Sequence, residues 1–203
     1  YQDDPCVTVY VKFKVTDDKG VFSAAGIDPD KTSFVIWTTT TWTLPGNLAV
    51  CLGPDIEYTA VKVGDEYLIM ARDLAPGVMK EAGIADYEMV GSFRGSELEY
   101  MKTAHPFLDR VSLVIVGDHV TLESGTGCVH TAPAFGVEDF DVCQNYPEIE
   151  LVIPVDASGR QTAEAGDFIA GQTLEESNKT IYARMEKDGS LFASQKITHS
   201  YPH

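Results

Sequence analysis

The sequence predicts an α+β fold that is rich in strands, with a closed or nearly closed β-barrel core and a few peripheral helices. Short segments with strand-like apolar patterns clearly outnumber helical ones, and they do not alternate with helices as βαβ units would. No repeat, low-complexity tract or long Pro/Gly/Ser linker divides the chain. Residues 1–203 are therefore expected to form a single domain.

The expected strands follow one another along most of the chain. The first has apolar residues alternating with polar ones, the period-two pattern of a half-buried strand: Val7, Val9, Val11, Phe13 and Val15. Further strands are expected at residues 33–38, 48–52, 58–63, 67–71, 87–93, 111–116, 120–122 and 128–131. Gly64 and Asp65 lie between two of these and indicate a hairpin. Residues 16–32, rich in Asp and Gly, predict a loop.

Three helices are expected, over about residues 74–82, 136–145 and 174–188. Asp73 is the expected N-cap of the first. The third has the clearest signals, because Thr173 and Glu176 have the spacing of a capping box and Gly189 follows the last turn.

Composition limits the classes of partner. The chain has 15 Lys+Arg against 31 Asp+Glu, a net charge of −16, so a general nucleic-acid surface is not expected, although contact with one nucleotide or a chain end is possible. No apolar run reaches the roughly 18–20 residues of a membrane span. Four cysteines form no CxxC pair, which predicts no zinc site and fits a reducing cytosol: Cys6, Cys51, Cys128 and Cys143. The chain starts at Tyr1 without Met and is expected to be excised from a larger protein, with its two ends close together.

Two segments carry residues suited to chemistry. Residues 37–47, WTTTTWTLPGN, place hydroxyls where a strand meets a turn, and such a corner can hold a carbonyl, a ribose hydroxyl or a water. A strand edge with its hydroxyls in water is the alternative. Residues 125–141, GTGCVHTAPAFGVEDFD, place His130 at a strand end and three carboxylates at a helix start. The alternative there is a core histidine with acidic residues that merely favour the helix dipole.

No motif for a nucleophile, a metal or a nucleotide is present. The sequence has no GxSxG, HExxH, Walker or GxGxxG pattern. Cys128 and His130 are too close in sequence to form a typical protease pair. Any hydrolysis would therefore depend on binding, positioning and a held water.

Together, the two segments closely resemble the signature stretches of the editing domain inserted into isoleucyl-tRNA synthetases. The matching stretches are WTTTTWTLPGNLAV and GTGCVHTAPAFGVEDFDV, with VYVKFKV, GDHVTLESGTG and HSYPH as matching flanks. The resemblance covers essentially the whole chain. Valyl and leucyl enzymes carry related domains, but those typically have an Arg-Pro pair where this chain has Thr40 and Thr41. The family commonly has proline where Thr41 stands, so this corner is expected to be slightly freer here.

The resemblance implies an editing reaction. Such a domain hydrolyses the ester between a wrong amino acid, chiefly valine, and the 3′ acceptor end of isoleucine tRNA, as the second sieve of the synthetase. No cofactor or metal is implied for editing, whereas the parent enzyme is expected to use ATP and to bind zinc outside this segment. The remainder of the synthetase is the other expected partner. A cytoplasmic protein with no membrane and no DNA partner is expected.

The resemblance also implies residue roles. Asp139 aligns with the aspartate that binds the substrate's α-ammonium group. Thr38, Thr39 and Thr40 align with threonines that line the pocket, and Asn47 aligns with an asparagine of the same pocket that contributes to editing.

The remaining candidates concern the shape of the pocket. His130 aligns with a histidine whose bulk helps to exclude isoleucine. Trp42 and Phe135 are candidate walls, with a purely structural role as the alternative. Two other functions stay open: a valyl- or leucyl-type editing domain, and a non-catalytic module that holds the tRNA acceptor end.

Overall fold

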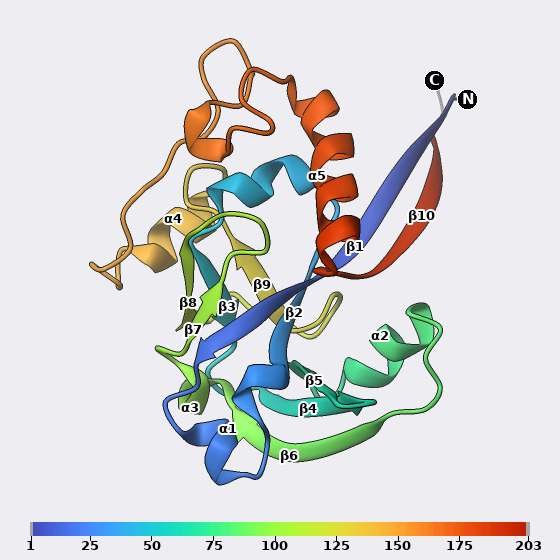
Figure 1. Cartoon of the computed structure of the whole chain (residues 1–203), viewed down its shortest axis with the longest axis vertical. Helices are drawn as coiled ribbons and strands as arrows, with labels where there is room; N and C mark the ends of the chain where they lie inside the picture. Colours follow the sequence, from blue (N-terminus) through green and yellow to red (C-terminus); the bar gives the residue numbers. More distant parts are fainter. Residues whose placement is uncertain (1, 202–203) are drawn as a thin grey trace.

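The computed structural model describes residues 2–201, with side chains described from residue 8 to residue 194. Its longest strand, β1 (Gln2–Asp17), pairs in turn with β10 (Leu191–Tyr201), β2 (Thr32–Thr38) and β7 (Lys102–Ala104). In the antiparallel β1–β10 ribbon, Gln2 pairs with Tyr201, so the described ends of the chain lie side by side, as expected (Figure 1). Part of the HSYPH flank, residues 202–203, lies outside the described residues.

The strands form one ten-stranded sheet. Its order is β6–β4–β5–β2–β1–β7–β8–β3–β9, with β10 added beside β1. The remaining strands are β3 (Ala49–Leu52), β4 (Glu57–Val63), β5 (Glu66–Ala71), β6 (Glu88–Arg94), β8 (Val111–Val116) and β9 (Cys128–Thr131). The α-helices are α1 (Val21–Ala24), α2 (Ala75–Glu81), α3 (Gly95–Leu98), α4 (Val137–Cys143) and α5 (Leu174–Asp188). The short 3₁₀ helices within residues 2–201 are η1 (Pro29–Lys31), η2 (Thr41–Gly46) and η3 (Ala163–Ala165).

The central strands are buried on both faces. In β2, Phe34 and Ile36 belong to one apolar cluster and Val35 to another, because alternate side chains point to opposite faces of a strand. In β3, Val50 and Cys51 are divided in the same way. Helix α2 covers the outer face at β2, β4 and β5, and α4 covers it at β3 and β8. This two-sided burial explains why these strands are continuous apolar runs in the sequence.

The sheet is open, so the expected closed or nearly closed β-barrel is wrong. The strand order runs from β6 at one edge to β9 at the other, and these edges do not pair with each other within residues 2–201. In the segment before β9, the Thr126 hydroxyl donates to the Val35 carbonyl of β2 (2.6 Å), and the Thr126 carbonyl accepts from the Ala71 N–H of β5 (2.7 Å). Gly125 and Gly127 have positive φ, so the chain turns here rather than extending into a ladder.

Several local expectations are wrong. Helix α2 has Leu74, not Asp73, at its N-cap, without a side-chain hydrogen bond. Residues 120–122 are not a strand, and the expected loop at 16–32 contains α1 and η1. Strands β7 and β10 were not expected.

The helix that the sequence marks most clearly is confirmed. Helix α5 spans Leu174–Asp188, Thr173 and Glu176 form the capping box, and Gly189 ends the helix with φ of 82°. The helix buries Ile181 in the main core and packs against η2. No helix within residues 2–201 has the length and apolar character needed to cross a membrane.

Candidate functional site

The threonine-rich segment forms a corner between β2 and a 3₁₀ helix. Strand β2 ends at Thr38, whose hydroxyl oxygen accepts the Thr40 N–H (3.2 Å), and η2 begins at Thr41. Thr38 is buried, whereas Thr39 and Thr40 are exposed. Hydroxyl groups therefore gather at a strand-to-turn corner, as expected.

Asn47 and His130 connect the two signature segments. The Asn47 Nδ2 amide donates to the Ala49 carbonyl (3.0 Å) and to His130 Nδ1 (2.8 Å). Its Oδ1 accepts from the Ser112 hydroxyl. Because a carbonyl can only accept, the amide nitrogen must face Ala49, and His130 Nδ1 must then be the acceptor. The proton of the neutral ring is therefore on Nε2.

The second ring nitrogen extends this chain of hydrogen bonds. His130 Nε2–H donates to the Thr43 hydroxyl (2.9 Å), which in turn donates to the Thr40 carbonyl (2.8 Å). Desolvation lowers the pKa of His130 to about 4. Protonation would also place an Nδ1–H against the amide hydrogens of Asn47. His130 is consequently neutral, and both of its nitrogens are occupied.

Thr41, at the position where the family commonly has proline, does not free the corner. It is buried, and its hydroxyl donates to Asn178 Oδ1 on α5 (2.8 Å). The same oxygen accepts the Trp42 N–H (2.8 Å). Asn178 therefore satisfies a backbone donor in the first turn of η2, where the helix itself offers no acceptor.

Asp139 lies in the first turn of α4 and is half-buried. Its Oδ2 accepts the Ala132 N–H (3.0 Å), which ties α4 to the chain two residues beyond His130. Burial raises the pKa of the Asp139 carboxyl, while the Ala132 bond and nearby His119 oppose this rise. Asp139 Oδ1 has no hydrogen-bond partner among the described residues, so it is able to accept from a ligand.

The aromatic candidates contact each other. The rings of Trp42 and Phe135 meet edge to face, with centroids 5.1 Å apart. Phe135 also covers Gly46, where a Cβ would approach the ring to 2.7 Å. This contact joins η2 to the loop before α4.

The structure thus joins Thr40, Asn47 and His130 in one hydrogen-bonded chain and links Asp139 to it through the backbone. Among the described side chains, no hydrogen bond joins Asp139 to the threonines of the corner. Sequence patterns did not single out Thr43, Ser112 or Asn178, because their relevance comes only from partners distant in sequence.

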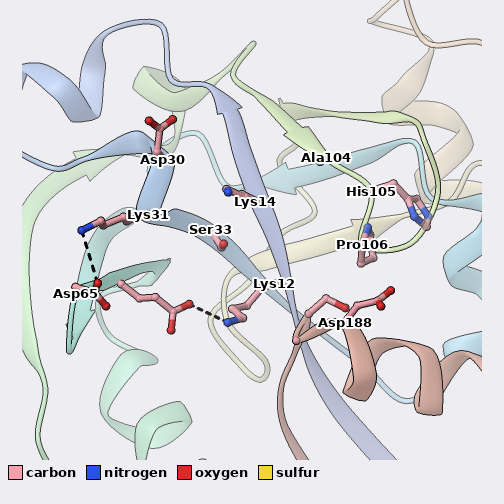
Figure 2. A pocket seen from close by; sticks show the side chains of 13 residues that line it. Lys12, Lys14, Asp30, Lys31, Ser33, Asp65, Ala104, His105, Pro106 and Asp188 are labelled. Atoms are coloured by element: carbon pink, nitrogen blue, oxygen red, sulfur yellow. Dashed lines mark hydrogen bonds and ion pairs between the residues drawn. The ribbon is translucent and has the colours of Figure 1, made fainter.

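A cleft of about 490 Å³ lies elsewhere, between β1, the β7–β8 loop and the end of α5 (Figure 2). Two of its lysines are paired, Lys12 with Glu66 (2.8 Å) and Lys31 with Asp65 (3.6 Å). Its three lysines face four carboxylates, so its charge is not suited to bind an anion.

No group of three or more His, Cys, Asp or Glu side chains in the described part of the chain is arranged to hold a metal. Three of the cysteines, Cys51, Cys128 and Cys143, are buried and unpaired, and Cys6 lies outside the described side chains.

Known relatives decide the family. Over all 203 residues, the chain is 54% identical to an isoleucine–tRNA ligase of Caldicellulosiruptor bescii, 50% to one of Thermoanaerobacter sp. and 45% to one of Moorella thermoacetica. The chain belongs to the isoleucyl-tRNA synthetase family. It spans about a fifth of the length of these relatives (21–22%). No family model matches the chain.

Solved structures show which part of a synthetase has this fold. The editing domain of the Plasmodium falciparum cytosolic leucyl-tRNA synthetase matches with a TM-score of 0.70 over 96% of this chain and 99% of that chain, at 8% identity. The corresponding P. knowlesi domain gives 0.69 over 95% and 96%, at 11% identity. This member of the isoleucyl-tRNA synthetase family therefore has the fold of synthetase editing domains.

His105, which is buried, and His130, which is partly buried, should make the stability of this synthetase segment depend on pH. Burial lowers the pKa of His105 to about 3 and that of His130 to about 4, against 6.5 for an unperturbed histidine. Between pH 6.5 and 4 the unfolded chain binds more protons, so the free energy of unfolding falls as the pH falls. We expect each histidine to lower the free energy of unfolding by about 2 kcal/mol at pH 5 relative to pH 7. Urea unfolding at pH 7 and 5 measures this. His130→Gln should remove about half of the difference in unfolding free energy between pH 7 and pH 5. If this variant keeps the wild-type pH dependence, His130 is not a neutral histidine with a lowered pKa.

The Thr41–Asn178 contact predicts an asymmetric pair of variants. Thr41→Pro should change the free energy of unfolding by less than about 1 kcal/mol, because proline suits the first position of a helix and only the bonds of one hydroxyl group to Asn178 are lost. Asn178→Ala should cost about 1–3 kcal/mol, because it also leaves the Trp42 N–H without its acceptor. Thermal and urea unfolding of both variants test this. A larger loss in Thr41→Pro than in Asn178→Ala would show that Thr41 itself fixes the corner.

Proposed function

We propose that this chain is the editing domain of an isoleucyl-tRNA synthetase and hydrolyses the ester of valine mischarged onto isoleucine tRNA. The membership in this family, together with the fold shared with synthetase editing domains, carries the proposal. One methylene gives only about 1–3 kcal/mol of discrimination, a limit for which isoleucyl-tRNA synthetases are the standard example. A second site that admits valine and rejects isoleucine is the physical answer to that limit.

The arrangement of the site suits a reaction without a protein nucleophile. Cys128 is buried, and burial raises its thiol pKa far above the usual range, so no thiolate is available to attack an ester. His130 uses Nδ1 to accept from Asn47 and Nε2–H to donate to Thr43, so neither nitrogen is free to act as a general base. The site would act by positioning the ester and a water.

Each remaining group then has a role in positioning. The free Oδ1 of Asp139 would accept from the substrate's α-ammonium group, and a bound cation would favour the ionised carboxylate. Thr38, Thr39 and Thr40 would offer hydroxyls to the ester, the terminal ribose or the water. His130, fixed by two hydrogen bonds, would act as a rigid wall against the longer isoleucine side chain.

The proposal also includes the partners. The acidic net charge of −16 fits a domain that touches only the 3′ acceptor end, with the rest of the synthetase supplying basic surface. Editing itself would need no cofactor, while ATP and zinc would belong to other parts of the enzyme. The protein would work in the cytoplasm.

Substrate preference tests the function. We expect Val-tRNA(Ile) to be hydrolysed at least about tenfold faster than Ile-tRNA(Ile), since a steric clash adds to the methylene difference. His130→Ala should lower both rates, because Asn47 and Thr43 lose their partner, and should raise the Ile:Val ratio. Deacylation of Val-, Thr- and Ile-charged tRNA measures this. Binding of the charged tRNA without deacylation would indicate a module that only holds the acceptor end. A preference for Thr-charged tRNA would indicate a valyl-type site. An unchanged Ile:Val ratio in His130→Ala would show that this histidine has no part in selectivity.

Asp139 should be needed for activity more than for folding. Asp139→Asn keeps an oxygen for the Ala132 N–H but loses the charge that would face the ammonium group, so deacylation should fall roughly ten- to a hundredfold. Asp139→Ala should lower it further and also destabilise the chain by about 1 kcal/mol. The matched controls are Glu138→Gln and Asp141→Asn, both exposed acidic residues of α4. Equal losses of deacylation in all three amide variants would contradict the anchor role, and so would full activity in Asp139→Asn.

A further inference from the structure

The loop between β7 and β8 reaches η2 from a different part of the chain than α5. Its first residue, His105, is only 5% exposed, and its Nε2 lies 2.7 Å from the Leu44 carbonyl. Its Nδ1 accepts the N–H groups of Leu108 (3.1 Å) and Phe107 (3.3 Å). Two donors face Nδ1, so the proton is on Nε2 and is donated to Leu44. Figure 2 shows His105 and Pro106 on this loop at the rim of the cleft.

Arg110, the last residue of the same loop, binds carbonyl groups. One guanidinium nitrogen donates to the Pro45 carbonyl (2.6 Å) and to the Asn47 carbonyl (3.1 Å). The other donates to the Glu164 carbonyl (3.3 Å). Arg110 is half-buried and forms no ion pair with a described carboxylate. A charged donor is therefore used on backbone oxygens, where charge-assisted hydrogen bonds are stronger than neutral ones.

These contacts meet at the end of η2. The last carbonyls of a helix lack N–H donors within it. Here the loop donates to the Pro45 carbonyl and adds a second hydrogen bond to the Leu44 carbonyl, which also accepts the Asn47 N–H (2.9 Å). The third carbonyl belongs to Asn47, whose side chain holds His130 in its tautomer. A shift of the η2 end would move the Asn47 amide away from the ring.

We propose that His105 and Arg110 are positioning residues of the editing site, which hold the end of η2 so that Asn47 keeps His130 and Thr43 in place. Among the described side chains, neither residue forms a hydrogen bond with the corner hydroxyls or with Asp139, so they act through Asn47. The consequence for editing rests on the proposed function. The consequence for the His130 ring does not.

The variants are His105→Gln, which can still donate to Leu44 but loses the acceptor for the loop N–H groups, and Arg110→Gln. Arg110→Lys keeps the charge but cannot span two carbonyls as the guanidinium does, and it serves if Arg110→Gln fails to fold. Lys102→Gln is the matched control: it removes an exposed charge from the same hairpin without a contact to η2. All are compared below their melting temperatures.

The first measurement is the tautomer of His130, from long-range ¹H–¹⁵N spectra of its ring. Wild type and Lys102→Gln should show the Nε2–H form alone. Arg110→Gln and His105→Gln should show a mixture, because Asn47 no longer holds Nδ1. A pure Nε2–H form in a fully folded Arg110→Gln would overturn the proposal.

The second measurement is deacylation of Val-tRNA(Ile). Arg110→Gln should lower kcat roughly ten- to a hundredfold with KM within about threefold, with Arg110→Lys intermediate, since misplacement by about 1 Å can have such an effect. A loss of activity that only follows the unfolded fraction would overturn the proposal. If the wild-type chain hydrolyses no aminoacyl-tRNA, the proposed function fails, and the His130 tautomer alone then supports or overturns the positioning role.

Discussion

The site depends on satisfying the backbone polar groups of one short 3₁₀ helix. Such a helix cannot pair its own end groups, and η2 is largely buried, so each unpaired N–H or carbonyl would carry a desolvation cost. The partners come from separate parts of the chain: Asn178 and Gln161 hold the Trp42 N–H and carbonyl, and the β7–β8 loop holds the other end. The position of every threonine in the corner is therefore a property of the whole fold rather than of the threonine segment.

Local patterns in the sequence predicted the elements that local interactions determine. Helix α5 could be bounded from its capping box and terminal glycine, and β4 and β5 from a hairpin signal, because these signals lie within or beside the elements themselves. Strand β10 was not expected, since its place beside β1 depends on a partner almost two hundred residues away. The barrel was wrong for the same reason: closure depends on whether the two sheet edges, β6 and β9, pair with each other, and no local pattern in either strand shows this.

The same distinction holds for the site. The two signature segments identified Thr40, Asn47 and His130, and the structure joins all three. The residues that hold them were not identified, because a histidine or an arginine in a loop has no pattern that reveals which carbonyl it meets. Thr41 shows the limit most clearly: as a substitute for proline it predicted a freer corner, but Asn178, 137 residues away, takes up its hydroxyl.

The network also decides what kind of chemistry the site is able to perform. Both histidines near η2 are neutral, and in each the Nδ1 faces amide donors while the Nε2–H meets an oxygen. Arg110 is a cation that contacts η2, and its charge is directed to carbonyls. The site therefore has little positive charge with which to select a ligand. The carboxylate of Asp139, whose Oδ1 has no hydrogen-bond partner among the described residues, is its charged group for a ligand. Under the proposed function, such a site would distinguish ligands by an ammonium group and by the fixed shape around it, a combination that suits discrimination between amino acids that differ only in size.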